Sequence, residues 1–304
     1  MPQDPNQRGE AAFLTSLSAP SVPSADADRG AGGADLSRYD ALVLQGGGAR
    51  CFYTLGFLEV VGPALSGVRQ VAAVSASAAM ACAHLAGGHR EALSMFAARV
   101  RRNPRNFYPG RLLRGERPTP HLAMYSGAMS DFLTPERFAR IRAHEQRLRI
   151  VVAKGPSRSK LLITGLAALT VLRPRPAPLL RLHVLCAAQM QQASELVFAV
   201  LASSAFPPFT PVPTLPGSEL AIIDGGAVAP VPVAALHGAA RPLVLLTRPA
   251  PRLPLPAGLP LVGPREPLPL RTWEYNNEPG LHHVYERGLR DGEEFLRSGA
   301  VRRS

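Results

Sequence analysis

The chain has 304 residues, of which 46% are hydrophobic, and this is enough for one large α/β domain or two small ones. Its formal net charge is +12, and almost all of the positive charge comes from arginine, because Lys154 and Lys160 are the only lysines. The three cysteines show no C-x-x-C spacing, which argues against a disulfide framework or a cysteine-based metal site. No zinc-finger, RNP-like or basic-zipper pattern is present, so we expect no nucleic-acid partner.

The excess of arginine allows two interpretations. It can reflect the base composition of the genome, or it can serve contact with anionic surfaces such as phosphate head groups. The N-terminus is polar and lacks the apolar core of a signal peptide. The longest apolar run, Leu161–Leu172, is shorter than an ordinary transmembrane helix. We therefore expect a cytoplasmic protein, with peripheral membrane contact as a further expectation.

The predicted elements alternate between strands and helices from about residue 39 onward. Residues 1–36 are rich in Pro, Ser, Ala, Gly and Asp and are predicted to form a disordered leader, whereas residues 37–304 form the folded domain. A first strand is expected over 39–44, and the three glycines that follow it open a helix. The next elements are a strand and two helices, expected over 68–75, 76–88 and 91–100.

Residues 99–180 are predicted to form a variable cap or insertion region. Its first part, 99–117, is basic and irregular, a helix with a threonine N-cap begins near residue 134, and a strand covers 148–154. The apolar run Leu161–Leu172 in this region is either a lid helix over an acyl pocket or a buried core helix.

The second half of the chain continues the alternation. A strand, a helix, a strand that runs into a turn, and the last core strand are expected over 181–189, 195–206, 220–233 and 241–249. Residues 250–304 supply a Pro-rich connector and a C-terminal helix. Strands that alternate with helices predict an α/β fold with a mostly parallel central sheet and helices on both faces.

Three consecutive glycines, Gly46, Gly47 and Gly48, lie between the first strand and its helix. Backbone N–H groups at a helix N-terminus can point at an anion when no side chains stand in the way. The stretch is therefore a phosphate cradle, an oxyanion hole or a tight turn against a close neighbour. The Walker and Rossmann glycine patterns are both absent.

Ser75 lies at the corner between an apolar strand and the next helix, which is the position of the serine in a nucleophile elbow. The usual G-x-S-x-G signature is replaced by Ala73 and Ser77 at its two glycine positions, with Ala76 after the serine. Residues larger than glycine at these positions can crowd the elbow. A serine here can also be a simple helix N-cap.

Asp224 follows another apolar strand and precedes Gly225 and Gly226. A carboxylate at the C-terminal end of a parallel strand lies at the edge where α/β sheets place their functional sites. The alternative is an ordinary Asp-Gly turn.

Taken together, the glycine loop, the serine corner and the late Asp-Gly-Gly turn resemble the patatin-like phospholipases. The segment "ASSAFPPFTPV", Ala202–Val212, is similar to the Ala-Ser-Ser-x-x-Pro segment that precedes the aspartate strand in that family. The resemblance covers about residues 39–247 and is weak over 99–180. It implies a three-layer α/β sandwich and a Ser–Asp dyad in place of a Ser-His-Asp triad.

The resemblance also implies roles for particular residues. Ser75 is the expected nucleophile, Asp224 the expected base, and Gly46–Gly48 the expected oxyanion hole, with Arg50 at the basic position that follows the glycines. The implied function is a lipid acyl hydrolase of the phospholipase A or esterase type. An acyltransferase, a lysophospholipase and a catalytically weak lipid-binding protein remain alternatives.

A dyad of this kind needs no cofactor and no metal, and the chain shows no spacing typical of a catalytic zinc or calcium site. Histidines are expected to be structural or to lie on the surface. Because a free aspartate titrates near pH ~3.9, we expect activity to persist to a more acidic pH than in a histidine-dependent hydrolase.

The basic part of the cap is expected to contact anionic membranes. Guanidinium groups would meet lipid phosphates while the neighbouring apolar side chains enter the interface. A solvated loop is the alternative. The arginines in question are Arg99, Arg101, Arg102, Arg105, Arg111, Arg114 and Arg117.

Overall fold

The structure is a computed structural model that describes residues 34–156, 159–172, 179–207, 209–218, 220–239, 241–249 and 255–304. Most of the predicted leader, residues 1–33, lies outside these described residues. Leu36, which the sequence placed in the leader, is 2% exposed and packs in the main hydrophobic core. The folded unit therefore begins before residue 37.

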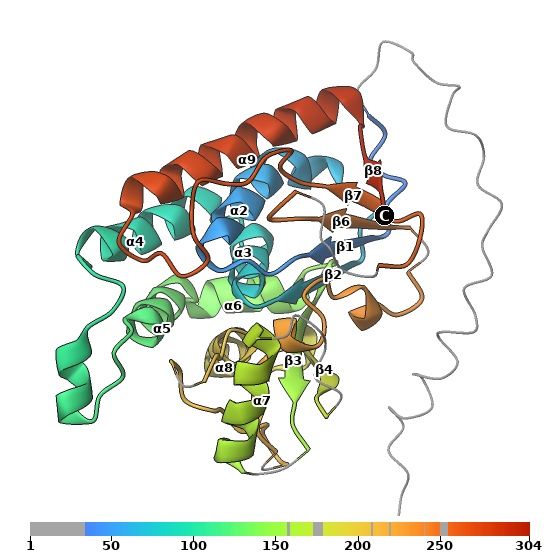
Figure 1. The fold of residues 1–304 in the computed structure, drawn as a ribbon. Coiled ribbons are helices and arrows are strands. Elements are labelled where there is room, and N and C mark those ends of the chain that lie inside the picture. Colours follow the sequence, from blue (N-terminus) through green and yellow to red (C-terminus); the bar gives the residue numbers. More distant parts are fainter. Residues whose placement is uncertain are drawn as a thin grey trace, which may run out of the picture. The chain divides into compact units, whose positions relative to one another are not determined.

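The centre of the fold is one sheet, which comprises eight strands among the described residues (Figure 1). Across the sheet the order is β4 (Arg181–Cys186), β3 (Arg147–Lys154), β2 (Gln70–Val74), β1 (Ala41–Leu44), β6 (Pro242–Leu245), β7 (Pro260–Val262) and β8 (Arg302–Arg303), with β5 (Ile222–Asp224) beside β3. Neighbouring strands β3, β2, β1, β6 and β7 run parallel. Three pairs are antiparallel: β4 with β3, β5 with β3, and β8 with β7.

The helices occur in most of the expected places. The α-helices are α2 (Phe52–Val61), α3 (Ala76–Leu85), α4 (His89–Arg101), α5 (His121–Phe132), α6 (Pro135–Ala143), α7 (Lys160–Leu172), α8 (Ala193–Ser203) and α9 (Glu278–Ser298). Short 3-10 helices are η1 (Gly48–Cys51), η2 (Gly62–Ala64), η3 (Pro109–Arg114), η4 (Ala187–Gln189), η5 (Gly225–Ala227) and η6 (Val233–Ala235). The sequence patterns did not predict α5. The strand expected over 241–249, β6, was to be the last core strand, but β7 and β8 follow it.

The two faces of the sheet are covered differently. Successive side chains of β1 point to opposite faces of the sheet, as in any strand. Leu42 and Leu44 lie on the first face, in one hydrophobic cluster with residues of α2, α3, α4, α5, α6, α8 and α9. Ala41 and Val43 pack in a second cluster, which is closed by the segment 228–239. The expected mostly parallel sheet with helices is confirmed; the second face is covered by this segment with its short helix η6 and, at Ala153 of β3, by α7.

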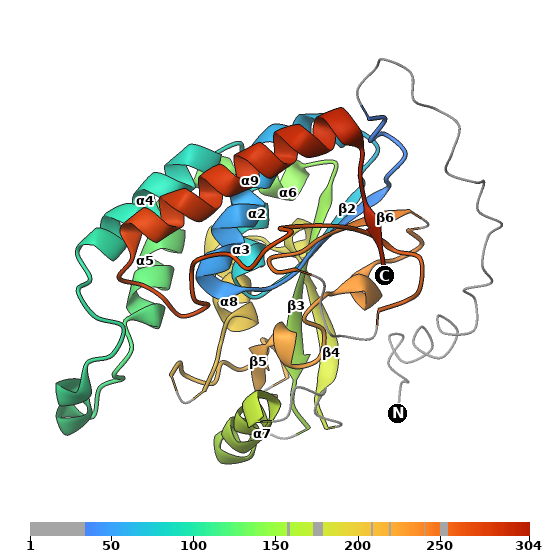
Figure 2. The same cartoon turned by 45° about the horizontal axis from the view of Figure 1, so that its top comes forward.

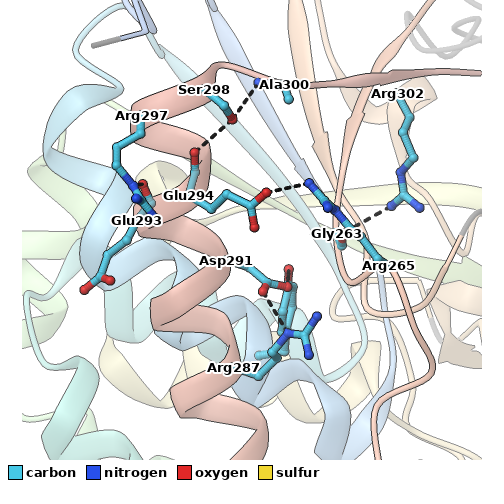
Figure 3. A network of polar contacts seen from close by, with 11 residues as sticks. Gly263, Arg265, Arg287, Asp291, Glu293, Glu294, Arg297, Ser298, Ala300 and Arg302 are labelled. Atoms are coloured by element: carbon cyan, nitrogen blue, oxygen red, sulfur yellow. Dashed lines mark hydrogen bonds and ion pairs between the residues drawn. The ribbon is translucent and has the colours of Figure 1, made fainter.

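Helix α9 packs along α2, and glycines make the close approach possible. A Cβ on Gly288 would lie 2.1 Å from the Tyr53 carbonyl oxygen, and a Cβ on Gly56 would lie 2.1 Å from the Tyr285 carbonyl oxygen. The Tyr53 hydroxyl donates to Asp291, which also pairs with Arg287 (Figure 3). These contacts fix the C-terminal helix against the first helix after the glycine loop.

No helix among the described residues is both long and apolar enough to cross a membrane. The apolar run that the sequence singled out forms α7, whose inner residues Ile163 and Ala167 are buried against Ala221 and Ile223. Its outer residues Leu161 and Leu162 are exposed.

Strand β3 brings the ends of two other strands together. One edge of β3 pairs with β4 over Arg149–Lys154, so β2 and β5 must share the opposite edge. Strand β2 pairs up to Val151, and β5 pairs from Val152 onward in the opposite direction (Figure 2). The C-terminal ends of β2 and β5 therefore meet end to end at Val151 and Val152.

Candidate active site

Ser75 lies in the sharp turn between β2 and α3, with φ 59° and ψ −139°. Among the described residues it is the only non-glycine residue with a positive φ. Its backbone N–H donates to Ser203 Oγ at 2.8 Å, and the fully buried Ser203 hydroxyl donates to the Val151 carbonyl at 2.6 Å. This chain of hydrogen bonds ties the strained turn to β3.

Of the two residues that replace the usual elbow glycines, Ala73 is buried in β2 and Ser77 is buried in the first turn of α3. Ser77 is fully buried, and its Oγ accepts from the Val74 N–H at 3.1 Å. The same hydroxyl has the carbonyl oxygens of Val74 and Leu44 within 2.7 and 3.0 Å as acceptors. Ser77 therefore stabilises the turn through the backbone ends of β1 and β2, and it does not line the cavity described below.

Asp224 ends β5 and contacts Ser75 directly. Its Oδ2 accepts from Ser75 Oγ at 2.7 Å, and its Oδ1 accepts from the Gly226 N–H at 2.7 Å. Gly225 must be small because a Cβ there would lie 2.3 Å from the Val151 carbonyl oxygen. The strand is antiparallel to β3, so the expectation of a parallel strand before Asp224 was wrong.

Burial raises the pKa of Asp224 to about 6, although the hydrogen bonds from Ser75 and the Gly226 N–H lower it in part. This value is close to that of a free histidine, so it does not support the expectation that activity persists to a more acidic pH than in a histidine-dependent hydrolase. An acid with a pKa near neutrality is well placed to take and return a proton at physiological pH.

The three glycines have three different reasons to be glycine. A Cβ on Gly46 would lie 3.2 Å from Ser75 Cβ, and one on Gly47 would lie 2.5 Å from Thr247 Oγ1. Gly48 has φ +58°, and a Cβ there would lie 2.1 Å from the Thr272 carbonyl oxygen. Bulkier residues would thus displace the loop or close the space above Ser75.

The N–H groups of this loop are not equivalent. Gly46 N–H donates to the Pro230 carbonyl at 3.3 Å and is used inside the protein. Within the part of the chain that the structure describes, the N–H groups of Gly47 and Gly48 have no partner. Of the three glycines predicted to form an oxyanion hole, Gly47 and Gly48 therefore have available backbone donors, whereas the Gly46 N–H holds the loop. The oxyanion hole itself stays a prediction.

A cavity of about 300 Å³ opens above these residues. The predicted residues Gly46, Gly47, Gly48, Arg50, Ser75, Ala76, Asp224 and Gly226 all line it, whereas Ala73 lies buried in β2. Sequence reasoning did not assign the rest of the lining to the site: Ser204 and Phe206 lie in the family-like segment Ala202–Val212, and the others come from segments without a recognised motif. These residues include His121, Ser204, Phe206, Arg248, Thr272, Trp273 and Tyr275.

Histidines do not contact the reacting pair in the described structure. His121 lines the cavity, but its Nδ1 lies 2.6 Å from the Tyr275 hydroxyl, and burial lowers its pKa to about 4. His84 Nδ1 lies 3.1 Å from His89 Nε2, and burial lowers the pKa of His84 to about 3. His121 was not considered from the sequence, and its place in the cavity makes it the histidine to test.

No group of three or more His, Cys, Asp or Glu side chains within the described ranges could hold a metal ion. Burial raises the pKa of the free cysteines Cys51 and Cys82 to about 12, so neither is a thiolate. The expectation that no cofactor is required stays a prediction.

A mostly parallel sheet with a strained serine at a strand-to-helix corner is typical of α/β acyl hydrolases. The sequence profile of the patatin-like phospholipases matches residues 42–237, which is well over half of the chain. The chain belongs to this family, and its members are typically hydrolases of lipid esters. The resemblance inferred from the motifs is thus confirmed.

Among solved structures, the crystal structure of VipD from Legionella pneumophila matches with a TM-score of 0.35 and 12% sequence identity. The match covers 68% of this chain and 50% of VipD, so the chain spans about half the length of that protein. No protein in the curated set matches the chain.

We expect Ser75→Gly to be more stable than Ser75→Ala by about 1 kcal/mol, because glycine adopts a positive φ without strain. Both variants lack the hydroxyl, so the comparison isolates the backbone. Urea denaturation followed by circular dichroism measures the difference. Ala76→Gly, one residue later in α3, is the control and should be destabilising. Equal stabilities of the two Ser75 variants would show that the turn stores no strain.

We expect turnover of a soluble ester to fall as the pH drops through about 6, because Asp224 must be ionised to accept a proton. At pH 5 the rate should be about tenfold below its plateau, since each pH unit below the pKa removes nine-tenths of the carboxylate. The pH–rate profile of the wild-type protein measures this. A plateau that extends unchanged to pH 4.5 would contradict a buried Asp224 base.

Stability gives an independent check on the same carboxyl group. Because the pKa of Asp224 is raised in the folded state, ionisation of this group lowers the free energy of unfolding, and the loss is complete above about pH 6. The free energy of unfolding rises again as the pH falls and the carboxyl group becomes protonated. Asp224→Asn should therefore raise the melting temperature more at pH 8 than at pH 5. The opposite pH dependence would indicate an exposed or paired carboxylate.

Proposed function

We propose that this protein hydrolyses fatty-acyl esters of lipids through Ser75, with Asp224 as its base. The observation that supports this most directly is the 2.7 Å hydrogen bond from Ser75 Oγ to Asp224 Oδ2, in a cavity with free backbone donors. Family membership supports the lipid substrate. A serine hydroxyl is a poor nucleophile until a base takes its proton, and here the carboxylate contacts it without an imidazole between them.

The proposed first step is acylation. Asp224 takes the proton as Ser75 Oγ attacks the ester carbonyl, and the resulting oxyanion accepts hydrogen bonds from the N–H groups of Gly47 and Gly48. A lost oxyanion donor typically costs ~3 kcal/mol of transition-state stabilisation. When the tetrahedral intermediate collapses, the carbon–oxygen bond to the alcohol breaks, and Asp224 returns the proton to the departing alkoxide.

Deacylation repeats the same steps with water. Asp224, again ionised, takes a proton from a water molecule that attacks the acyl-enzyme carbonyl. Collapse of this second intermediate breaks the bond to Ser75 Oγ, which recovers its proton, and the fatty acid is released. An alcohol in place of the water would make the same protein an acyltransferase, so the identity of the product decides between these two activities.

We expect a fluorophosphonate to label Ser75, and Ser75→Ala to abolish both labelling and turnover of a p-nitrophenyl ester. Asp224→Asn keeps the shape but removes the base, and should lower turnover at least about a hundredfold. Mass mapping of the adduct and initial rates are the measurements. Free fatty acid as the main product, with glycerol present as a competing acceptor, would support hydrolysis over transfer.

Two controls separate this mechanism from its competitors. Ser77→Ala should not abolish labelling, because Ser77 is buried behind the turn. His121→Gln should cost far less than Asp224→Asn. An adduct on another residue, or a loss of turnover in His121→Gln equal to that in Asp224→Asn, would contradict the Ser–Asp assignment. If the protein is not labelled and hydrolyses no ester, it is a lipid-binding member of the family.

We also propose that the basic cap segment 99–117 contacts anionic membranes. Leu112 is 56% exposed and Leu113 is 92% exposed on η3, beside the half-exposed Phe107. Of the arginines expected to take part, Arg99 pairs with Asp131 and Arg101 pairs with Glu278. Arg111 and Arg114 both pair with Glu116. Arg102 and Arg105 make no ion pair with any residue that the structure describes.

We expect replacement of Leu112 and Leu113 by Ser, or of Arg102 and Arg105 by Gln, to reduce sedimentation with phosphatidylglycerol vesicles. Wild-type binding should weaken with added salt, because exposed charges act over about 10 Å at 0.1 M salt. Turnover of a soluble ester should stay at the wild-type level in these variants. Unchanged sedimentation would mean that the arginine excess is compositional.

A further inference from the structure

Four consecutive N–H groups of the glycine loop divide into two that hold the loop and two that are available. The outer two, on Gly46 and Ala49, donate to backbone carbonyls at 3.3 and 3.0 Å, and the acceptor of Ala49 is Thr272. The N–H groups of Gly47 and Gly48 between them have no partner in the described part of the chain, and both residues line the cavity. The loop is therefore held on either side of its two available donors.

The direction of each available N–H depends on the carbonyl group of the residue before it. A peptide unit is planar and trans, so its C=O and N–H groups point in opposite directions. A contact that holds the Gly46 carbonyl therefore orients the Gly47 N–H, and a contact that holds the Gly47 carbonyl orients the Gly48 N–H. The partners of these two carbonyls decide where the two donors point.

Thr247 holds the first of these carbonyls. Its hydroxyl donates to the Gly46 carbonyl at 2.9 Å, which is the nearer of two acceptors, since Gln45 Oε1 lies at 3.3 Å. Thr247 is fully buried and follows β6, which is the parallel neighbour of β1. A residue after one strand thus orients the loop that follows the neighbouring strand.

Thr272 acts on the second carbonyl through Arg50. The Gly47 carbonyl accepts from the Arg50 N–H at 3.3 Å and from Arg50 Nε at 3.5 Å, and the second of these contacts requires that the side chain stays in place. Arg50 Nη2 donates to Thr272 Oγ1 at 2.7 Å, which holds the guanidinium group there. Because the Thr272 carbonyl also accepts from Ala49, one residue holds the loop by both its backbone and its hydroxyl.

The segment that carries Thr272 is fixed by its own hydrogen bonds. Asn277, the N-cap of α9, donates from Nδ2 to Glu274 Oε1 at 3.1 Å, and Glu274 Oε2 accepts from the Arg271 N–H at 2.8 Å. Asn103, which follows α4, donates from Nδ2 to the Tyr275 carbonyl at 2.6 Å. These contacts hold the turn that places Thr272 against the glycine loop.

We propose that Thr247 and Thr272 are positioning residues of the reaction, which orient the Gly47 and Gly48 N–H groups toward the oxyanion that forms on the substrate carbonyl. This inference rests on the proposed hydrolase function. Both threonines lie beyond residue 237, where the match to the family profile ends, so family membership does not supply this role. Loss of either hydroxyl frees one peptide unit to rotate, which weakens binding of the transition state more than binding of the ester.

Valine has nearly the shape of threonine but no hydroxyl, so Thr247→Val and Thr272→Val test the two contacts. Each variant should lower kcat for p-nitrophenyl butyrate at least about tenfold with little change in KM, because the oxyanion exists only after the attack. Thr247→Ser and Thr272→Ser keep the hydroxyl and should retain most of the wild-type kcat. Valine variants that turn over the ester at the wild-type rate would overturn the inference.

An inhibitor that forms the oxyanion separates positioning from a general loosening of the structure. Ser75 Oγ attacks the carbonyl carbon of an octyl trifluoromethyl ketone as Asp224 takes the hydroxyl proton, and the ketone oxygen becomes the oxyanion. The inhibition constant should rise in the valine variants by about the factor by which kcat/KM falls. A fall in kcat with an unchanged inhibition constant would overturn the inference.

Thr134→Val is the matched control. Thr134 caps α6, where its hydroxyl accepts from the Arg137 N–H at 3.3 Å, and it does not line the cavity. Its replacement should lower the melting temperature but leave kcat and the inhibition constant unchanged. If Thr134→Val or the two serine variants lose as much turnover as the valine variants at the site, the hydroxyl contacts are not responsible and the inference is overturned.

Hydrogen exchange separates failure of this inference from failure of the proposed function, because it needs no turnover. In the protein without substrate, Thr247→Val and Thr272→Val should each speed amide exchange over residues 46–51, whereas Thr134→Val should not. Faster exchange in a protein that hydrolyses no ester would refute the hydrolase and keep the role of the threonines in holding the loop. Hydrolysis that neither valine variant changes would refute the inference and keep the hydrolase.

Discussion

The candidate site depends on the pairing of β2 and β5 along one edge of β3. Val151 and Val152 are neighbours in β3, and they pair with Val74 and Asp224 respectively. Because β2 and β5 run toward each other, the residue that follows β2 and the residue that ends β5 must lie side by side. The hydrogen bond between Ser75 and Asp224 is therefore a consequence of strand register, and a slip of one residue in either strand would separate them.

Several unfavourable features gather at this point of the fold. Ser75 has a strained backbone, Asp224 has a pKa that desolvation raises to about 6, and Arg50 is a half-buried cation without a counter-ion among the described residues. Such features persist only where the surrounding structure holds them in place. Here the surroundings are the large helical core on one face of the sheet and the hydrogen bonds of Ser203, Ser77 and Thr247. The hydrogen bond between Ser75 and Asp224 is thus held in place by the fold itself.

The cavity combines two kinds of residue. Ser75, Asp224 and the glycine loop lie within the family match, and they account for the proposed chemistry. Arg248 and the segment Thr272–Tyr275 come from the chain beyond residue 237 and form part of the wall. Helix α9, packed on α2 through its glycines, follows this segment and helps to fix it. The cavity wall is therefore built partly from the family-matched region and partly from the chain that follows it.

The sequence by itself determined the local features of this protein. Strand-to-helix corners, glycine positions and the Asp-Gly-Gly turn depend on backbone geometry over a few residues, so Ser75, Asp224 and the glycine loop could be recognised, together with most helices and strands. Only the tertiary structure decided the antiparallel direction of β5, the use of the Gly46 N–H inside the protein, and the places of His121 and Arg248 in the cavity wall. These depend on contacts between residues far apart in the chain. The raised pKa of Asp224 has the same origin, because the burial that causes it is produced by the whole fold and by no single stretch of sequence.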